Sequence, residues 1–140
     1  MKKAYVTFLT PTHDKKDTVL VEVPDLEILT EGYGIADAIY MARDAIGLSG
    51  IVREDHGEAI PEASDPRCLD PSGGSFAEAG ETFVTLVDID FSEYRKKHDN
   101  KTVRRNVTLP NWLNRAAEDA HLNVSRVLQD ALKEKLDIAQ

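Results

Sequence analysis

The segment from residue 102 to residue 140 constrains the fold most, because it holds one predicted strand and two predicted helices and cannot bury a core alone. The strand is predicted at Thr102–Leu109, where apolar and polar side chains alternate. The helices are predicted at Asn111 to about His121 and at Val124 to about Ile138, from apolar residues spaced three and four apart. A two-fold dimer is the simplest solution, because the strands of two copies can pair antiparallel and satisfy each other's N–H and C=O groups.

Pairing two copies of this strand gives a ribbon with two different faces. The apolar residues that we expect in the dimer core are Val103, Val107, Leu109, Leu113, Val127, Leu128 and Leu132. The opposite face of the strand carries Arg104, Asn106 and Thr108. A two-stranded ribbon fits the major groove of DNA, and these three side-chain types are among those that read base edges there. The same alternation also fits the solvated face of an edge strand, and the spacing alone leaves both interpretations open.

The start of the second predicted helix suits a DNA phosphate. Asn123 is well placed to cap this helix, and the free N–H groups and positive dipole end of a helix attract an anion. Residues 95 to 140 carry 10 Lys and Arg against 6 Asp and Glu, a net charge of +4. A basic segment of this kind can lie on phosphates. The residues that we expect to contact phosphate are Lys101, Asn123, Val124, Ser125 and Arg126.

Residues 103 to 136 resemble the ribbon-helix-helix family of dimeric repressors. The resemblance rests on the strand pattern Arg104-Arg105-Asn106-Val107-Thr108-Leu109-Pro110, an alanine-rich first helix, the turn His121-Leu122-Asn123 and the helix start Val124-Ser125-Arg126. It implies that the outward-facing strand residues contact bases and that the start of the second helix contacts phosphate. Arg105 departs from the pattern, because the family usually has an inward-facing aliphatic residue there. A helix-turn-helix is the alternative, although that motif normally needs a third helix for its core.

The first 94 residues predict a separate acidic module with the element order β-β-β-α-β. The expected strands are Ala4–Leu9, Thr18–Val23, Ile28–Glu31 and Thr82–Phe91, and a helix is expected from Ile35 to before His56. The module carries 7 Lys and Arg against 19 Asp and Glu, a net charge of −12. A Pro- and Gly-rich loop is predicted between residues 61 and 81. Residues 95 to 101 are charged and lack an apolar period, which predicts a basic linker to the domain at residues 102–140.

This acidic module resembles the HicB antitoxin family. The resemblance rests on motifs that follow one another in the family's order: Val21-Glu22-Val23-Pro24-Asp25-Leu26, Thr30-Glu31-Gly32, the helix with Ala38, Ala42 and Ala45, Gly57-Glu58-Ala59-Ile60-Pro61-Glu62, and Thr85-Leu86-Val87-Asp88-Ile89-Asp90 running into Ser92-Glu93-Tyr94. It implies an α+β protein whose partial RNase H-like domain blocks a basic, mRNA-cleaving HicA toxin, while the ribbon-helix-helix domain represses the operon. An acidic module suits a basic partner electrostatically. The acidic residues are spread over loops, helix and strands, so they single out no toxin-contacting site. The sequence also leaves open whether dimers pair into tetramers.

Other classes of protein fit the sequence less well. The single cysteine, Cys68, excludes an internal disulfide framework and cannot by itself supply a zinc site. No apolar run reaches the roughly 18 residues of a membrane helix, and no signal-peptide core follows Met1, which predicts a cytoplasmic protein. Asp88 and Asp90 share one strand face, so a two-metal nuclease is an alternative, but two carboxylates do not make a working site. We expect no catalytic residue, metal or cofactor. A repressor whose first module binds a small effector is the other alternative.

Overall fold

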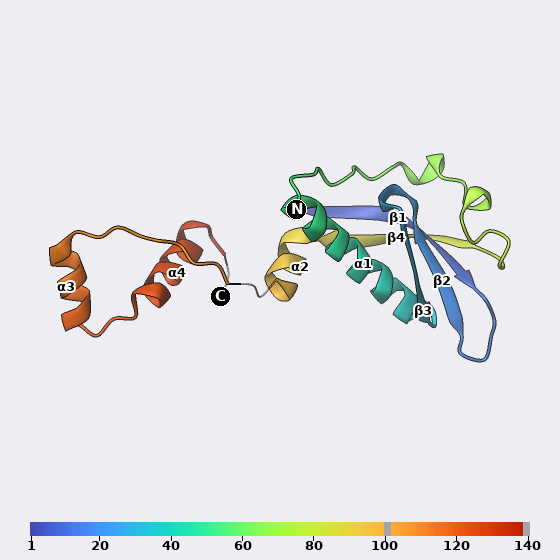
Figure 1. Cartoon of the computed structure of the whole chain (residues 1–140). Coiled ribbons are helices and arrows are strands. Elements are labelled where there is room, and N and C mark those ends of the chain that lie inside the picture. The colour runs from blue at the N-terminus through green and yellow to red at the C-terminus, as the bar shows by residue number, and fades with distance from the viewer. Residues whose placement is uncertain (100–101, 139–140) are drawn as a thin grey trace. The chain divides into compact units, whose positions relative to one another are not determined.

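A computed structural model describes residues 1–99 and 102–138 (Figure 1). The chain divides into two compact units, unit 1 at Met1–Lys101 and unit 2 at Thr102–Gln140. The α+β class predicted from the sequence is confirmed, because unit 1 is built on an antiparallel sheet with helices and unit 2 is helical. No helix in the described part of the chain is long and apolar enough to cross a bilayer.

Unit 1 contains a four-stranded antiparallel sheet in the order β3-β2-β1-β4. The strands are β1 at Lys2–Pro11, β2 at Thr18–Val23, β3 at Ile28–Tyr33 and β4 at Phe83–Asp90. With helix α1 between β3 and β4, the predicted order β-β-β-α-β is confirmed. β1 pairs with β4 from Lys2 opposite Asp90 to Leu9 opposite Phe83, so the last strand lies at an edge of the sheet.

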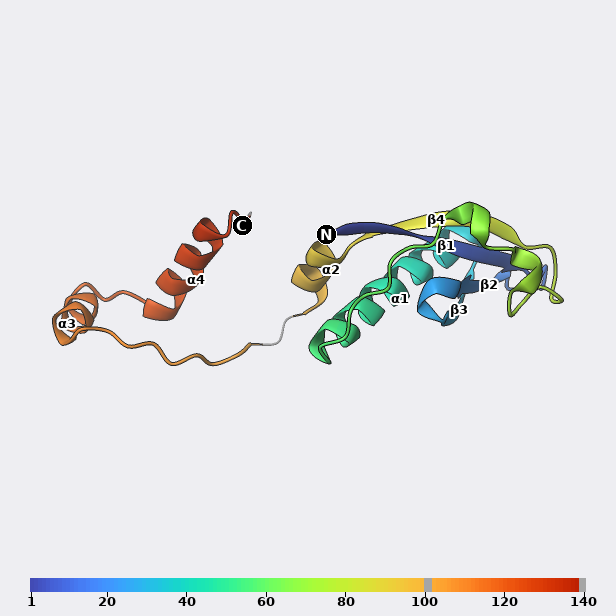
Figure 2. The same cartoon turned by 90° about the horizontal axis from the view of Figure 1, so that it is seen from above.

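One face of the sheet packs against α1, at Ile35–Asp55 (Figure 2). The strand residues in this core alternate along each strand, as the two-residue period of a strand requires. They are Tyr5, Leu9, Val19, Val21, Val23, Val87 and Ile89. The helix contributes Ala38, Ala42 and Ile46, and these small side chains let its backbone lie close to the sheet. Ile35, the first residue of α1, is 45% exposed.

The loop between α1 and β4 is held against the sheet by hydrogen bonds at several points. Ser64 donates from its main-chain N–H and its hydroxyl to Asp25, at 2.7 and 2.6 Å. Ser75 binds Glu22 in the same way, at 2.9 and 2.8 Å. Glu22 lies on the sheet face opposite α1, where the buried Phe8 is its neighbour on β1. The loop therefore covers part of the second face of the sheet.

The prediction of a linker at residues 95–101 is wrong for the residues before Asp99. Helix α2 occupies Phe91–His98. The carboxylate of Asp90 caps this helix by accepting hydrogen bonds from the N–H groups of Ser92 and Glu93, at 3.1 and 3.3 Å. Phe91 is 4% exposed and belongs to the core, and Tyr94 packs against that core. Only these two residues of α2 contact the core, and two residues are too few to produce a recognisable helical spacing of apolar residues in the sequence. The basic residues of α2 therefore belong to unit 1.

Unit 2 consists of α3 at Asn111–Asp119 and α4 at Val124–Lys135, preceded by an irregular segment at residues 102–110. The two helices confirm those predicted from apolar spacing, although each ends earlier. The predicted strand at Thr102–Leu109 is not formed within the single chain. A strand requires a hydrogen-bonded neighbour, and unit 2 contains no second extended segment among its described residues. The strand therefore stays a prediction that depends on a second copy.

Candidate nucleic-acid interface

The irregular segment before α3 presents two different sides. Arg105, Val107 and Leu109 line an apolar groove, whereas Arg104, Asn106 and Thr108 are exposed and do not line it. This alternation is the one expected of a strand with an inner and an outer side. The predicted base-reading residues thus lie together on the outer side, and Arg105 lies on the inner side despite its charge.

The groove has a volume of about 410 Å³ and is walled by α3 and α4. Of the residues predicted for a dimer core, those that line it are Val107, Leu109, Leu113, Val127 and Leu128. Val103 and Leu132 lie outside the groove, with exposed fractions of 82% and 52%. No residue of α3 or α4 is buried. The apolar side chains of α3 and α4 therefore remain accessible to solvent in a single copy of the chain.

The start of α4 has the capped geometry predicted from the sequence. The side-chain oxygen of Asn123 accepts a hydrogen bond from the N–H of Arg126 at 3.1 Å, which confirms Asn123 as the N-cap. Val124 and Ser125 form the first turn, where N–H groups have no partner inside the helix. Arg126 reaches Asp130 only at 3.9 Å, and both side chains are exposed. Lys101, the remaining predicted phosphate contact, lies outside the described residues.

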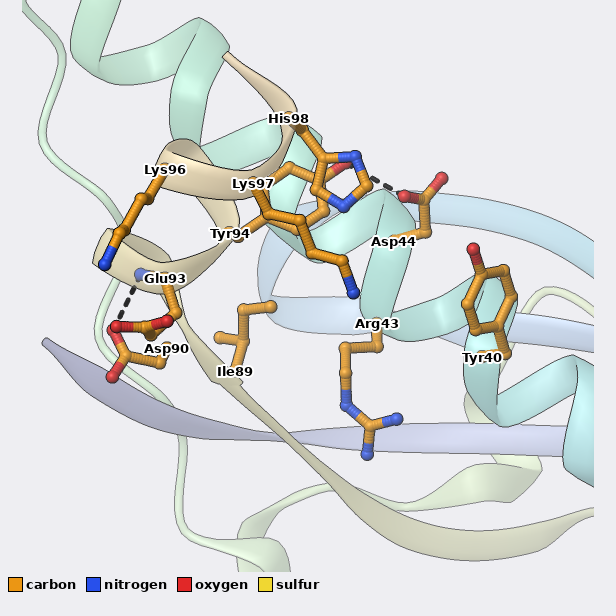
Figure 3. Close-up of a pocket in the computed structure, with 10 residues that line it drawn as sticks. All are labelled: Tyr40, Arg43, Asp44, Ile89, Asp90, Glu93, Tyr94, Lys96, Lys97 and His98. Atoms are coloured by element: carbon orange, nitrogen blue, oxygen red, sulfur yellow. Dashed lines mark hydrogen bonds between the residues drawn. The ribbon is translucent and has the colours of Figure 1, made fainter. Parts of the chain in front are cut away.

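Unit 1 carries a second concave feature that the sequence analysis missed, a cleft of about 650 Å³ between α1, α2 and the end of β4 (Figure 3). Tyr94 forms one wall, where its hydroxyl donates to Asp44 at 2.9 Å and its ring stacks on His98 at a centroid distance of 4.3 Å. Burial and then the hydrogen bond to Asp44 raise the pKa of Tyr94 to about 12. Arg43 of α1 and Lys97 of α2 also line the cleft, and the guanidinium of Arg43 reaches Asp88 on β4. The sequence signal for this cleft is a pair of glycines on α1, Gly47 and Gly50, against which Tyr94 and Phe91 pack.

The two aspartates considered for a nuclease are engaged separately. Asp88 pairs with Arg43 at 3.0 Å, while Asp90 caps α2 and faces the N-terminal ammonium at 3.5 Å. The N–H of Glu93 contributes most to lowering the pKa of Asp90 below its ordinary value. Within residues 1–99 and 102–138, no group of three or more His, Cys, Asp and Glu side chains is placed to hold a metal ion.

Two solved structures share this fold. A chain of a toxin–antitoxin complex from Streptococcus pneumoniae is 24% identical, with a TM-score of 0.59 over 96% of this chain and 99% of that one. The antitoxin HicB of Burkholderia pseudomallei is also 24% identical, with a TM-score of 0.52 over 96% of this chain and 97% of that one. No family model matches the sequence, and no curated protein sequence matches it. The likenesses establish the fold of the chain.

Proposed function

We propose that this protein is an antitoxin that binds a HicA-type mRNA-cleaving toxin through unit 1 and represses its own operon through unit 2. The observation that carries the proposal is the unit 2 segment with one side toward an open apolar groove and Arg104, Asn106 and Thr108 on the other. The fold shared with the antitoxin HicB supports the antitoxin role.

In this proposal, unit 2 is one half of a ribbon-helix-helix dimer. The segment at residues 102–109 pairs with its copy, which supplies the hydrogen-bond partner that the single chain lacks. The helices of the second copy cover Val107, Leu109, Leu113 and their neighbours, which line the groove. The paired outer sides then enter the major groove of DNA, and the capped start of α4 binds a phosphate.

In the same proposal, unit 1 captures the toxin by charge as well as by shape. Unit 1, residues 1 to 101, carries 11 Lys and Arg against 20 Asp and Glu, a net charge of −9, so it attracts a basic protein and repels nucleic acid. Unit 2, residues 102 to 140, carries 6 Lys and Arg against 5 Asp and Glu, a net charge of +1, so it lacks the acidity that would repel DNA. No reaction is assigned to the protein.

The proposed DNA contacts are tested with the DNA that lies upstream of the gene encoding this protein. We expect Arg104→Ala and Asn106→Ala each to weaken binding by about 1–3 kcal/mol and to relax the preference for certain bases. The matched control is Arg115→Ala, which removes the same charge from an exposed position of α3. Binding is measured by fluorescence anisotropy at fixed salt. Unchanged binding in both ribbon variants, or an equal loss in the control, would contradict the assignment.

A repressor that binds a small effector is the second candidate function, and the cleft of Figure 3 favours it. Its volume of about 650 Å³ lies in the range of small-molecule sites. The two candidates differ in what they require nearby. A neighbouring short reading frame whose basic product binds unit 1 supports the antitoxin, whereas DNA binding that changes with a metabolite, in the absence of such a protein, supports the effector-controlled repressor.

A further inference from the structure

The sheet of unit 1 ends in a strand whose outer edge has no neighbour in the sheet. β4 is the last strand in the order β3-β2-β1-β4. The N–H of Phe91 donates to the carbonyl of Met1 at 3.1 Å, so odd-numbered residues of β4 direct their main-chain groups toward β1. The N–H and C=O groups of Val84, Leu86 and Asp88 therefore point away from the sheet.

This edge is apolar and open over its first part. Phe83, Val84 and Leu86 are 52%, 45% and 54% exposed, and residues 83–87 include no charge and no proline. The far end is covered, because Arg43 donates to the carbonyl of Asp88 at 2.9 Å and to its carboxylate at 3.0 Å. An edge strand with these properties is a template for an added strand.

The opposite edge of the sheet, β3, is protected in ways that β4 is not. The N–H of Gly34 donates to the carbonyl of Asp17 at 2.7 Å, so the main-chain N–H and C=O groups of the odd-numbered residues of β3 point away from the sheet. Among these, Tyr33 has its N–H occupied by Asp37 at 2.8 Å, and Glu31 adds a charge to the strand. Leu29 remains exposed, at 56%. The two edges therefore differ in protection although both carry an exposed leucine.

The net charge of unit 1 indicates what kind of partner binds at the open edge of β4. Glu81 is exposed at the open end of the apolar stretch, and unit 1, residues 1 to 101, carries a net charge of −9. A second copy at this edge would bring two acidic units together, whereas a basic protein would be attracted. We propose that an extended segment of the basic toxin adds to the edge of β4 as a fifth strand. This inference rests on the proposed antitoxin function and names its binding surface.

The added strand would be recognised in two ways. Its main chain would pair with the outward groups of Val84 and Leu86, and its apolar side chains would cover theirs. Its Lys or Arg side chains would lie near Glu81, which flanks the stretch at its open end. The cleft of Figure 3 begins beside the covered end of β4, where Arg43 and Ile89 line it.

The test uses the full-length chain and the purified product of the neighbouring short reading frame, with affinity measured by calorimetry. We expect Leu86→Lys to weaken binding by at least about tenfold, because the new charge meets a basic strand on an apolar edge. Leu29→Lys is the matched control, since it makes the same change on β3 at nearly the same exposure, and we expect it to change the affinity less than about twofold. Leu86→Pro removes an outward N–H, and we expect it to weaken binding as well.

Each result leads to a separate conclusion. Thermal unfolding and circular dichroism check that unit 1 of each variant is folded. Equal effects of Leu86→Lys and Leu29→Lys, or no effect of either substitution at Leu86, would overturn the edge assignment while leaving the antitoxin function intact. A change of oligomeric state in Leu86→Lys with unchanged toxin affinity would show that a second copy occupies the edge and would also overturn it. Failure of the unaltered chain to bind the toxin would overturn the proposed function itself.

Discussion

Tyr94 couples the packing of α2 to pH. Its raised pKa, about 12 against an ordinary value of 10.0, means that the folded state favours the protonated phenol. The corresponding contribution to stability is complete below pH 10.0 and is lost as the pH rises toward about 12. We expect the free energy of unfolding to fall over this range in the unaltered protein, and Tyr94→Phe to lack that part of the fall. Denaturant titrations at several pH values measure it. Tyr33→Phe is the control, because Tyr33 is 57% exposed, and identical pH profiles for all three proteins would contradict the expectation.

Gly50 is required by the close approach of α2 to α1. A Cβ atom at this position would overlap the ring of Phe91, a buried side chain that has little room to move. We expect Gly50→Ala to destabilise unit 1 by about 1–3 kcal/mol through overpacking, although alanine raises helix propensity by about 1 kcal/mol. Chemical denaturation followed by circular dichroism measures the change. Gly73→Ala is the control, since a Cβ there meets no atom within 4 Å, and a stabilised Gly50→Ala would show that the contact relaxes freely.

At the scale of elements, predictability follows from how much of each element's packing is local. β2 has the predicted bounds, because Val19, Val21 and Val23 alternate in an otherwise simple strand. The position of α1 was also predicted, and Ala42 and Ile46 are buried as its apolar spacing indicates, but the exact limits of the buried side depend on where the sheet lies. Ala38 and Gly50 face the core or α2, while the larger Ile35 is exposed.

Helix α2 was not predicted from the sequence, whereas the strand predicted in unit 2 is not formed in the single chain, and the two differences have opposite reasons. In α2 the charged residues dominate the pattern, and its two core contacts depend on glycines more than 40 positions away, Gly47 beside Tyr94 and Gly50 beside Phe91. In the segment at residues 102–109 the alternating pattern is clear, but the partner that would make it a strand lies outside the single chain. The site residues could therefore be placed on one side of a segment, while their arrangement across two copies remains a proposal.

At the scale of the whole molecule, the two units predict separable functions. We expect a fragment of residues 1–99 to bind the toxin, to lack DNA binding and to sediment as a monomer, because the proposed dimer contacts lie in unit 2. The fragment must include α2. Arg95 pairs with Glu54 and Asp55 on α1 at 3.1 and 3.2 Å, and Phe91 belongs to the core.

A shorter fragment of residues 1–94 is the matched control for this division. It lacks the rest of α2, so we expect it to unfold at a lower temperature while keeping the same β4 edge. Toxin binding that is absent from a folded 1–99 fragment would show that the division of functions between the units is wrong.

The open groove of unit 2 has a consequence for gene control. Its apolar walls are covered only when two copies meet, so in the proposed repressor a lone chain lacks an organised reading surface. Occupancy of the promoter then follows the square of the free subunit level at low abundance. Transcription would resume abruptly, rather than in proportion, once degradation or dilution carries the pool below the level at which subunits find one another.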